Sequence, residues 1–261
     1  KLEEQRGFDL LRKKFGIKKN NKFICLAVRD GAYLNDHNSK YQYRNYEIES
    51  FHEACKALSD LGYYVIRMGK KVQKETKIPG YKFIDYASSS YRSDFLDFFL
   101  IKNCTYVIST TTGIDSVAYM FNKPICYIVL ALGFINFNRK NNFWLPSVFI
   151  DHNSKKISLS DMFKKNLIFT NKKEDYLKAK VIPLQSNSQE IKDFAIEMHN
   201  YLLNQETTST ENLLQVKFWD IYKKNFIKFN YFNNFIKMKF KNNTRISNSF
   251  LKSNREWFLN D

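Results

Sequence analysis

The stretch at residues 105–129 constrains the fold of this chain more than any other. It contains an apolar run (residues 106–108), a turn of small and hydroxyl-bearing residues (109–113), a short helical segment and a second apolar run that begins at Pro124. In a strand–turn–helix unit, the first backbone N–H groups of the helix point outward and carry partial positive charge, which favours an anion. The pattern therefore predicts a phosphate site at the turn, with an ordinary N-capped helix as the alternative.

Four continuous apolar runs predict the central strands of one sheet. Each run is apolar without alternation, which is typical of strands that are covered on both faces. The runs lie at residues 24–28, 64–67, 106–108 and 125–128. Helical segments separate them along the chain, so we expect four parallel neighbours. The predicted fold class is α/β, with a doubly wound, mainly parallel Rossmann-like sheet and a C-terminal helical extension.

Capping residues and shorter runs mark the connections. Asn45 and Ser93 are the expected N-caps of two helices that follow them. Residues 82–87 predict one further short strand, whereas residues 134–146 are aromatic and rich in asparagine without a clear period. We therefore expect the regular alternation to weaken after the fourth strand.

Basic and polar residues follow three of the predicted strands. Arg29 and Asp30 come after the first strand, and Arg67 ends the second, just before Gly69 and Lys70; the turn at 109–113 follows the third. The carboxyl ends of parallel strands lie at one edge of a sheet, so these residues are expected to converge. Two arginines and a helix N-terminus can neutralise a diphosphate. Because the protein itself supplies these charges, we expect no metal and no other cofactor.

The familiar fingerprints of other nucleotide sites do not occur. The sequence contains neither GxGxxG nor GxxxxGK[ST], and no pair of acidic residues stands at a predicted strand end to hold a metal ion. The four cysteines lack CxxC spacing and fall in apolar surroundings, so we expect small buried side chains in a reducing compartment. These features disfavour a P-loop, a nicotinamide site and a zinc site.

The loop at residues 31–46 is long for a connection within a compact domain. It carries several tyrosines and charged residues, among them Tyr33 and Arg44. Long loops of this kind are often functional, which makes these two residues candidates for the acceptor side of a site. A surface excursion without a function is the alternative.

The net charge of +16 raises the question of nucleic acid. Lysines outnumber arginines 33 to 9, and the chain is also rich in Asn, Ile, Phe and Tyr, a bias that an AT-rich genome produces without selection for a ligand. The basic residues are spread along the chain outside the tail and form no nucleic-acid-binding motif. Nucleic acid is therefore not the expected partner.

The tail at residues 214–255 is the exception, because it holds ten Lys or Arg residues and a single acid, Asp220. Three interpretations remain open: a helix with a solvated basic face, a contact with an anionic membrane, and a nucleic-acid surface. No apolar run is long enough for a membrane-spanning helix. We expect a cytoplasmic protein that associates peripherally, if at all, with the inner face of the cell membrane.

Several segments together resemble a family of bacterial surface-polysaccharide glycosyltransferases. The resemblance covers most of the chain. The segments are VRDGAY (28–33), YRNYEIESF (43–51), YYVIRMGK (63–70), YRSDFLDFFL (91–100), STTTGIDSVAYMFNKPICYI (109–128) and SNREWFL (253–259). The resemblance implies the GT-B architecture, in which two Rossmann-like domains face one another and the C-terminal one holds a nucleotide-sugar donor. This chain would then be mostly the donor domain, with the N-terminal acceptor domain absent or reduced.

The resemblance also implies a domain organisation. Residues 1–21 would form an entry helix between domains, residues 22–150 the nucleotide-sugar-binding domain, and residues 151–261 the completing strands and helices with the basic aromatic extension. The implied partners are a nucleotide-sugar donor and a glycan or lipid-linked acceptor. The implied reaction is metal-independent transfer of the sugar to a surface-glycan acceptor.

The resemblance assigns the phosphate contacts to the strand ends. Arg29 would pair with the diphosphate and stabilise the charge that develops as the nucleotide leaves. Its basic strand end is similar to the one by which metal-independent fucosyltransferases hold a nucleoside diphosphate. Backbone N–H groups and hydroxyls of Thr111, Thr112 and Gly113 would bind the other phosphate.

The remaining candidates would surround the nucleotide and the sugar. Asp115 or Ser116 would meet the ribose or the sugar. Arg67, Gly69 and Lys70 would line the nucleotide side. Asp30 is named with Arg29 as a catalytic candidate, where it would orient Arg29 or face the acceptor; a structural ion pair with Arg29 or Arg44 is the alternative.

Two rival functions remain open. One is a non-catalytic module that binds a nucleotide sugar or phosphate and acts as a scaffold. The other is an adaptor for a membrane surface or nucleic acid that acts through the basic tail.

Overall fold

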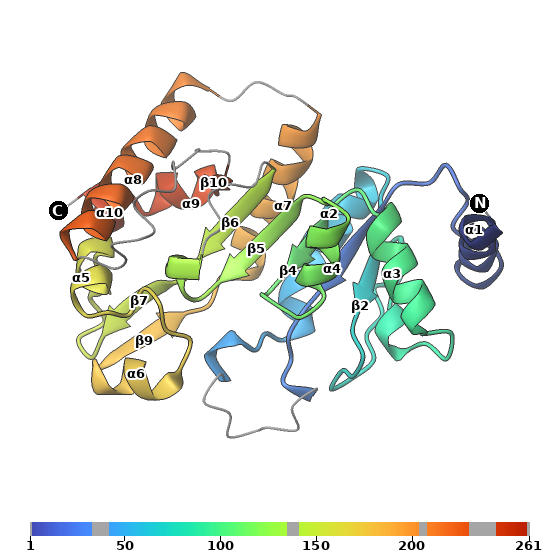
Figure 1. The fold of residues 1–261 in the computed structure, drawn as a ribbon, viewed down its shortest axis with the longest axis horizontal. Coiled ribbons are helices and arrows are strands. Elements are labelled where there is room, and N and C mark those ends of the chain that lie inside the picture. Colours follow the sequence, from blue (N-terminus) through green and yellow to red (C-terminus); the bar gives the residue numbers. More distant parts are fainter. Residues whose placement is uncertain (1, 33–41, 135–140, 204–207, 230–243, 260–261) are drawn as a thin grey trace. The chain divides into compact units, whose positions relative to one another are not determined.

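A computed structural model describes residues 2–32, 42–134, 141–203, 208–229 and 244–259. The chain divides into two compact units (Figure 1). Unit 1 comprises Lys1–Asn38, Asn45–Tyr127 and Asn187–Ile196, and unit 2 comprises Ser39–Arg44, Ile128–Ser186 and Glu197–Asp261. Hydrogen bonds join seven parallel strands in the order β10-β6-β5-β4-β1-β2-β3, and three more strands in the order β8-β7-β9.

The strands of unit 1 confirm the predicted parallel arrangement. They are β1 (Phe23–Ala27), β2 (Tyr64–Met68), β3 (Phe83–Ile84), β4 (Val107–Ser109) and the start of β5 (Ile125–Val129). All of β1, β4 and β5 is buried, as their uninterrupted apolar sequences require. β1 lies between β2 and β4, so that Cys25 is level with both Ile66 and Val107. The expectation of four neighbouring parallel strands is therefore correct.

The helices of unit 1 connect these strands. They are α1 (Leu2–Phe15), α2 (His52–Asp60) with a preceding 3-10 turn (Ile48–Phe51), α3 (Asp94–Asn103) and α4 (Asp115–Met120). Ser93 caps α3 as predicted, because its hydroxyl accepts a hydrogen bond from the backbone N–H of Leu96. Figure 1 shows α3 and α4 side by side, and α4 contacts β4. The predicted strand at 82–87 is shorter than expected, because Tyr86–Ser88 form a 3-10 turn.

The four cysteines confirm the expectation of small buried side chains. Cys25, Cys55, Cys104 and Cys126 all belong to unit 1, and all are buried as free thiols. Burial raises the pKa of the Cys25 and Cys55 thiols because a thiolate would lose its hydration. They therefore act as apolar packing residues.

Unit 2 contains more sheet than the sequence predicted for the C-terminal part. β6 (Asn142–Pro146) pairs in parallel with β10 (Thr244–Ile246). β7 (Val148–Asp151) pairs antiparallel with both β8 (Lys156–Ile157) and β9 (Val181–Leu184). The expected C-terminal helical extension is therefore only part of the structure. β6 is buried at every position, which explains why its sequence shows no alternation.

Helices and aromatic side chains complete unit 2. The helices are α5 (Leu159–Lys164), α6 (Lys173–Lys178), α7 (Ser188–Leu202, which begins in unit 1), α8 (Ser209–Lys228), α9 (Asn248–Ser253) and α10 (Arg255–Leu259). The buried face of α8 presents Phe218 and Tyr222, whose rings pack against Phe258 and Phe163 respectively. Within the described residues, no helix combines the length and the apolar sequence needed to cross a membrane.

Candidate functional site at the switch between β1 and β4

The strand order creates a topological switch next to β1. From β1 the chain continues to β2 on one side and then to β3, before it returns to β4 on the other side of β1. The connections leave β1 and β4 in opposite directions, which makes the carboxyl ends of these two strands the topological switch point of the sheet. In open parallel sheets this is the position where ligands bind. Two of the three predicted phosphate-binding segments follow β1 and β4.

Direct hydrogen bonds join the two segments. The backbone N–H of Arg29 donates to Thr110 Oγ1 at 2.8 Å, and the backbone N–H of Thr110 donates to the carbonyl of Ala27 at 3.1 Å. Hydrogen bonds therefore join the end of β1 and the turn after β4 into one edge. The structure brings Arg29 together with the turn at 109–113, although about 80 residues separate them in the sequence.

Arg29 supplies a positive charge at this edge. Its side chain is half-buried, and its Nε donates to Asn45 Oδ1 at 3.0 Å. Neither terminal nitrogen of its guanidinium bonds to another of the described residues. The expected role of Asn45 as an N-cap is wrong: the cap position of the following 3-10 turn is Glu47, and the Asn45 side chain orients Arg29 instead.

The turn after β4 has room for a ligand at Gly113. A side chain added there would meet no atom within 4 Å, and the backbone of Gly113 lies outside the left-handed region. Thr111 does adopt a left-handed conformation, with φ of 60°, and its hydroxyl donates to the carbonyl of Thr110. The turn is thus open on the side of Gly113 and internally fixed on the side of Thr111.

The sequence predicted that the first N–H groups of this turn are unpaired. At least one of them has partners within the turn. The Thr112 N–H donates to Asp115 Oδ2 at 3.0 Å and lies 3.3 Å from Ser109 Oγ. Asp115 is buried and begins a helix of only six residues, which has a small dipole. The predicted helix-terminal anion site is therefore occupied in part by the carboxylate of Asp115. Ser116, one residue further, is exposed.

Arg67 lies inside the unit rather than on its surface. Only 1% of its surface is exposed, and its guanidinium bonds to Asp85 Oδ2 at 3.1 Å, to Asp30 Oδ2 at 3.3 Å and to the carbonyl of Lys74 at 2.8 Å. Asp30 is also engaged through its other oxygen, which accepts the N–H of Ala32. The carboxylate of Asp30 thus pairs with Arg67, not with Arg29 or Arg44 as the structural alternative assumed.

Asp85 is a partner of Arg67 that the sequence did not predict, and its side chain is buried. Its Oδ2 accepts from Arg67, from the Thr76 N–H at 2.9 Å and from Ser88 Oγ. Asp85 directly follows the short strand β3, so the rule that selected Arg29 after β1 would also have selected it.

The other candidates are more dispersed. Lys70 is exposed, and Gly69 is tightly packed, since a Cβ there would lie 3.1 Å from Val72 Cγ1. Arg44 ends a 3-10 turn that belongs to unit 2. Tyr33 lies outside the described residues. The structure therefore unites Arg29 with the turn after β4, and Arg67 with Asp30, but does not show all candidates at one place.

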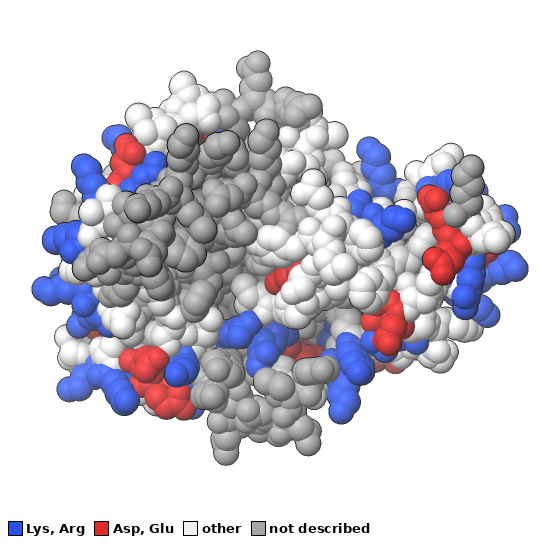
Figure 2. Space-filling model, in the orientation of Figure 1, with Lys and Arg blue, Asp and Glu red and all other residues white. Residues whose placement is uncertain are grey.

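Charged side chains of both signs occur on the face drawn in Figure 2. On the face drawn in Figure 2, Lys and Arg side chains are interrupted by acidic and uncharged ones. Within the described part of the chain, no group of three or more His, Cys, Asp and Glu side chains could hold a metal ion.

Comparison with known proteins gives no relative from which a function could be transferred. No protein-family model matches the chain, and neither the curated proteins nor the solved structures contain a significant match.

Proposed function

We propose that the edge between β1 and β4 binds the diphosphate of a nucleotide sugar, and that the chain is the donor-binding part of a metal-independent glycosyltransferase of GT-B type. The supporting observation is the orientation of Arg29. Asn45 holds its Nε, and no other described residue bonds to the two terminal nitrogens, while the backbone N–H of Arg29 bonds to the turn that follows β4. A fork of two N–H donors matches the oxygens of a phosphate group.

The chemistry of transfer gives this arginine a role. When the bond between the sugar and the diphosphate breaks, negative charge grows on the departing phosphate oxygens. A guanidinium that is already oriented stabilises that charge without further reorganisation. The open space at Gly113 allows the backbone of the turn to approach the same diphosphate closely. The acceptor in this proposal is a surface glycan or a lipid-linked precursor.

The buried pair of Arg67 and Asp30 has an indirect role in this proposal. Arg67 is too buried to reach a ligand, and Asp30 binds both Arg67 and the Gln73 N–H. Together they fix the segment that carries Arg29, while the exposed Lys70 is the candidate contact on the nucleotide side. Arg29 is therefore the residue on which the test depends.

The test begins with a thermal-shift screen of UDP-, GDP-, TDP- and CMP-sugars, in which a bound donor raises the melting temperature. CMP-sugars lack a diphosphate and serve as the contrast. The best nucleotide is then titrated calorimetrically into three variants. Arg29→Ala should weaken binding about tenfold or more, because it removes charge-assisted hydrogen bonds to phosphate.

Gly113→Val and Arg12→Ala complete the experiment. Gly113→Val should also weaken binding by blocking the approach of the ligand, yet leave the unfolding free energy nearly unchanged, because the site is open. Arg12 is an exposed arginine on α1, so its replacement should change nothing. Unchanged affinity in Arg29→Ala would contradict the proposal.

A non-catalytic nucleotide-sugar-binding module is the second candidate. The observation in its favour is that both carboxylate oxygens of Asp30 are engaged by the fold, which leaves Asp30 poorly placed to act as a base. Hydrolysis or transfer of the bound donor, lost in Arg29→Ala, would support the transferase. Tight binding without any turnover would support the module.

A further inference from the structure

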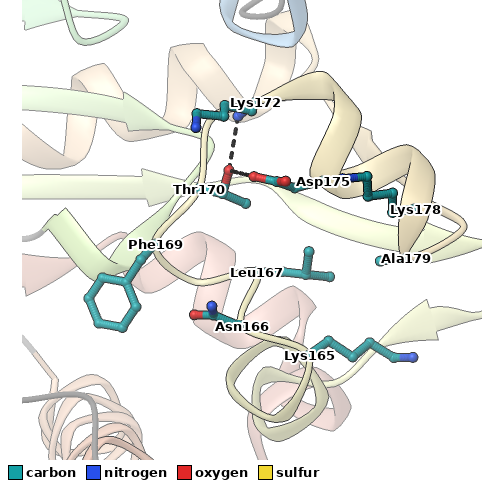
Figure 3. A pocket seen from close by; sticks show the side chains of 9 residues that line it. All are labelled: Lys165, Asn166, Leu167, Phe169, Thr170, Lys172, Asp175, Lys178 and Ala179. Carbon is teal, nitrogen blue, oxygen red and sulfur yellow. Dashed lines mark hydrogen bonds between the residues drawn. The ribbon is translucent and has the colours of Figure 1, made fainter.

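A second candidate binding site lies in unit 2. A cavity of about 600 Å³ opens between the C-terminal end of α5 and helix α6. It is lined by Lys165, Asn166, Leu167, Phe169, Thr170, Lys172, Asp175, Lys178 and Ala179 (Figure 3). This volume falls within the range of small-molecule sites. None of these residues belongs to the site between β1 and β4.

The walls of the cavity are fixed by local hydrogen bonds. α5 ends with Asn166 in a left-handed conformation (φ 56°), while the N–H groups of Asn166 and Leu167 bond back to the carbonyls of Phe163 and Met162. This is the Schellman arrangement, in which asparagine is one of the few residues tolerated. On the opposite wall, the Thr170 hydroxyl binds Asp175 and accepts the Lys172 N–H at 3.1 Å (Figure 3).

The charge of the lining favours an anion. Lys165, Lys172 and Lys178 are exposed at the cavity, and their ammonium groups have no ion-pair partner among the described residues. The single acid in the lining is Asp175, whose Oδ2 accepts a hydrogen bond from the Thr170 hydroxyl. Three lysines in the lining make the surroundings of the cavity positive, which attracts a phosphate, and the attraction weakens with salt.

The remaining polar groups suit hydroxyls. The side-chain amide of Asn166 and the second oxygen of Asp175 have no hydrogen-bond partner among the described residues, so they offer donors and an acceptor to a ligand. The buried Leu167 supplies an apolar surface between them (Figure 3). We propose that this cavity binds a phosphorylated sugar, with the lysines on the phosphate and Asn166 and Asp175 on the hydroxyls. The proposal does not depend on a nucleotide site in unit 1.

The experiment titrates glucose 6-phosphate, inorganic phosphate and glucose into the full chain and follows binding by calorimetry. Glucose 6-phosphate should bind most tightly, inorganic phosphate more weakly and glucose not measurably. The double variant Lys172→Glu/Lys178→Glu should weaken glucose 6-phosphate binding by about tenfold or more, because it reverses the charge of two of the three lysines in the lining. The matched control is Lys217→Glu/Lys224→Glu on the exposed face of α8, which changes the net charge equally and should leave the affinity unchanged.

Asn166→Gly separates sugar recognition from charge. Glycine keeps the left-handed backbone that ends α5 but removes the amide, so the affinity for glucose 6-phosphate should fall while that for inorganic phosphate stays the same. Equal affinity for inorganic phosphate and glucose 6-phosphate would overturn the assignment of a sugar. Absence of binding, or binding that survives Lys172→Glu/Lys178→Glu, would overturn the site itself.

Discussion

At the scale of single residues, the two strand-end arginines show how similar sequence positions acquire different roles. Arg67 belongs to β2, and its side chain is enclosed by Asp30 and Asp85. Arg29 lies two residues beyond the end of β1, where the chain has left the sheet and the side chain can reach solvent. The difference is one of burial, because Arg67 stabilises the scaffold while Arg29 remains accessible to a ligand.

We predict that Arg67→Met destabilises the protein by about 3–5 kcal/mol, because it leaves two buried carboxylates without their positive partner. Arg29→Met should cost less than about 1 kcal/mol, since the half-exposed side chain makes one hydrogen bond to the described residues, to Asn45. Urea unfolding of both variants at neutral pH measures the two values. Similar unfolding free energies for the two variants would contradict this distinction.

The sequence predicts the residues of the candidate site better than their contacts. Arg29 and the turn after β4 were expected to converge because both follow parallel strands, and the hydrogen bond between Arg29 and Thr110 shows that they do. The partners Asn45 and Asp85 were not expected in their roles. Local rules assigned Asn45 to a helix cap, whereas a contact with Arg29 across 16 positions determines its orientation.

At the scale of elements, one carboxylate joins two helices of unit 2. Glu197 on α7 accepts hydrogen bonds from the Asn248 N–H at 2.8 and 2.9 Å and from Ser247 Oγ at 3.0 Å, which lie at the start of α9. Burial of this carboxylate raises its pKa to about 7, although these hydrogen bonds and the nearby Arg245 act in the opposite direction. The folded state therefore binds a proton at Glu197 more tightly than the unfolded chain does.

We predict that this contact makes stability depend on pH. Below about pH 4.5 the Glu197 carboxyl is protonated in both states, so its contribution to the unfolding free energy is fully present. As the pH rises to about 7, the unfolded chain loses this proton first, and the stabilising contribution is lost. Between these values the unfolding free energy of the parent should fall relative to Glu197→Gln by about 3 kcal/mol.

Urea unfolding of parent and variant from pH 4.5 to 7.5 tests the sign and the size. The control is Glu256→Gln, which removes an exposed carboxylate from α10 and should follow the parent at every pH. A constant difference between the parent and Glu197→Gln would show that Glu197 is not protonated preferentially in the folded protein.

Elements differ in how well the sequence predicts them. Continuous apolar runs located β1, β4 and β5 because central parallel strands are buried on both faces. β6 is also buried at every position, but Asn142 and Pro146 interrupt its apolar run. The pattern of apolar residues therefore did not reveal this strand. The pairing of β6 with β10 depends on residues about a hundred positions apart, which no local pattern can reveal.

At the scale of the whole molecule, the net charge is +16, and on the face drawn in Figure 2 acidic and uncharged side chains separate the Lys and Arg side chains. The exposed face of α8 is nevertheless notable. It presents the aliphatic side chains Leu213, Val216 and Ile227, each more than half exposed, among Lys217, Lys224 and Lys228, with Asp220 as the single acid. Such a face is compatible with an anionic lipid surface as well as with simple solvation.

We predict that the full chain binds vesicles that contain phosphatidylglycerol at low ionic strength and is released at about 0.5 M salt, where screening is strong. Vesicles of phosphatidylcholine should not bind. Lys217→Glu/Lys224→Glu should weaken the sedimentation of protein with the anionic vesicles. Absence of binding at low salt would contradict the membrane contact and would leave solvation as the role of this basic face.

The placement of the cysteines and tryptophans provides separate reporters for the two units. All four cysteines belong to unit 1, and all three tryptophans, Trp144, Trp219 and Trp257, belong to unit 2. Every one of these side chains is buried. Thiol alkylation during a denaturant titration therefore reports when unit 1 opens, and indole fluorescence reports when unit 2 opens. Coincident curves would mean that the two units unfold as a single cooperative system. Separated curves would give the unfolding free energy of each unit. Neither measurement requires an introduced label.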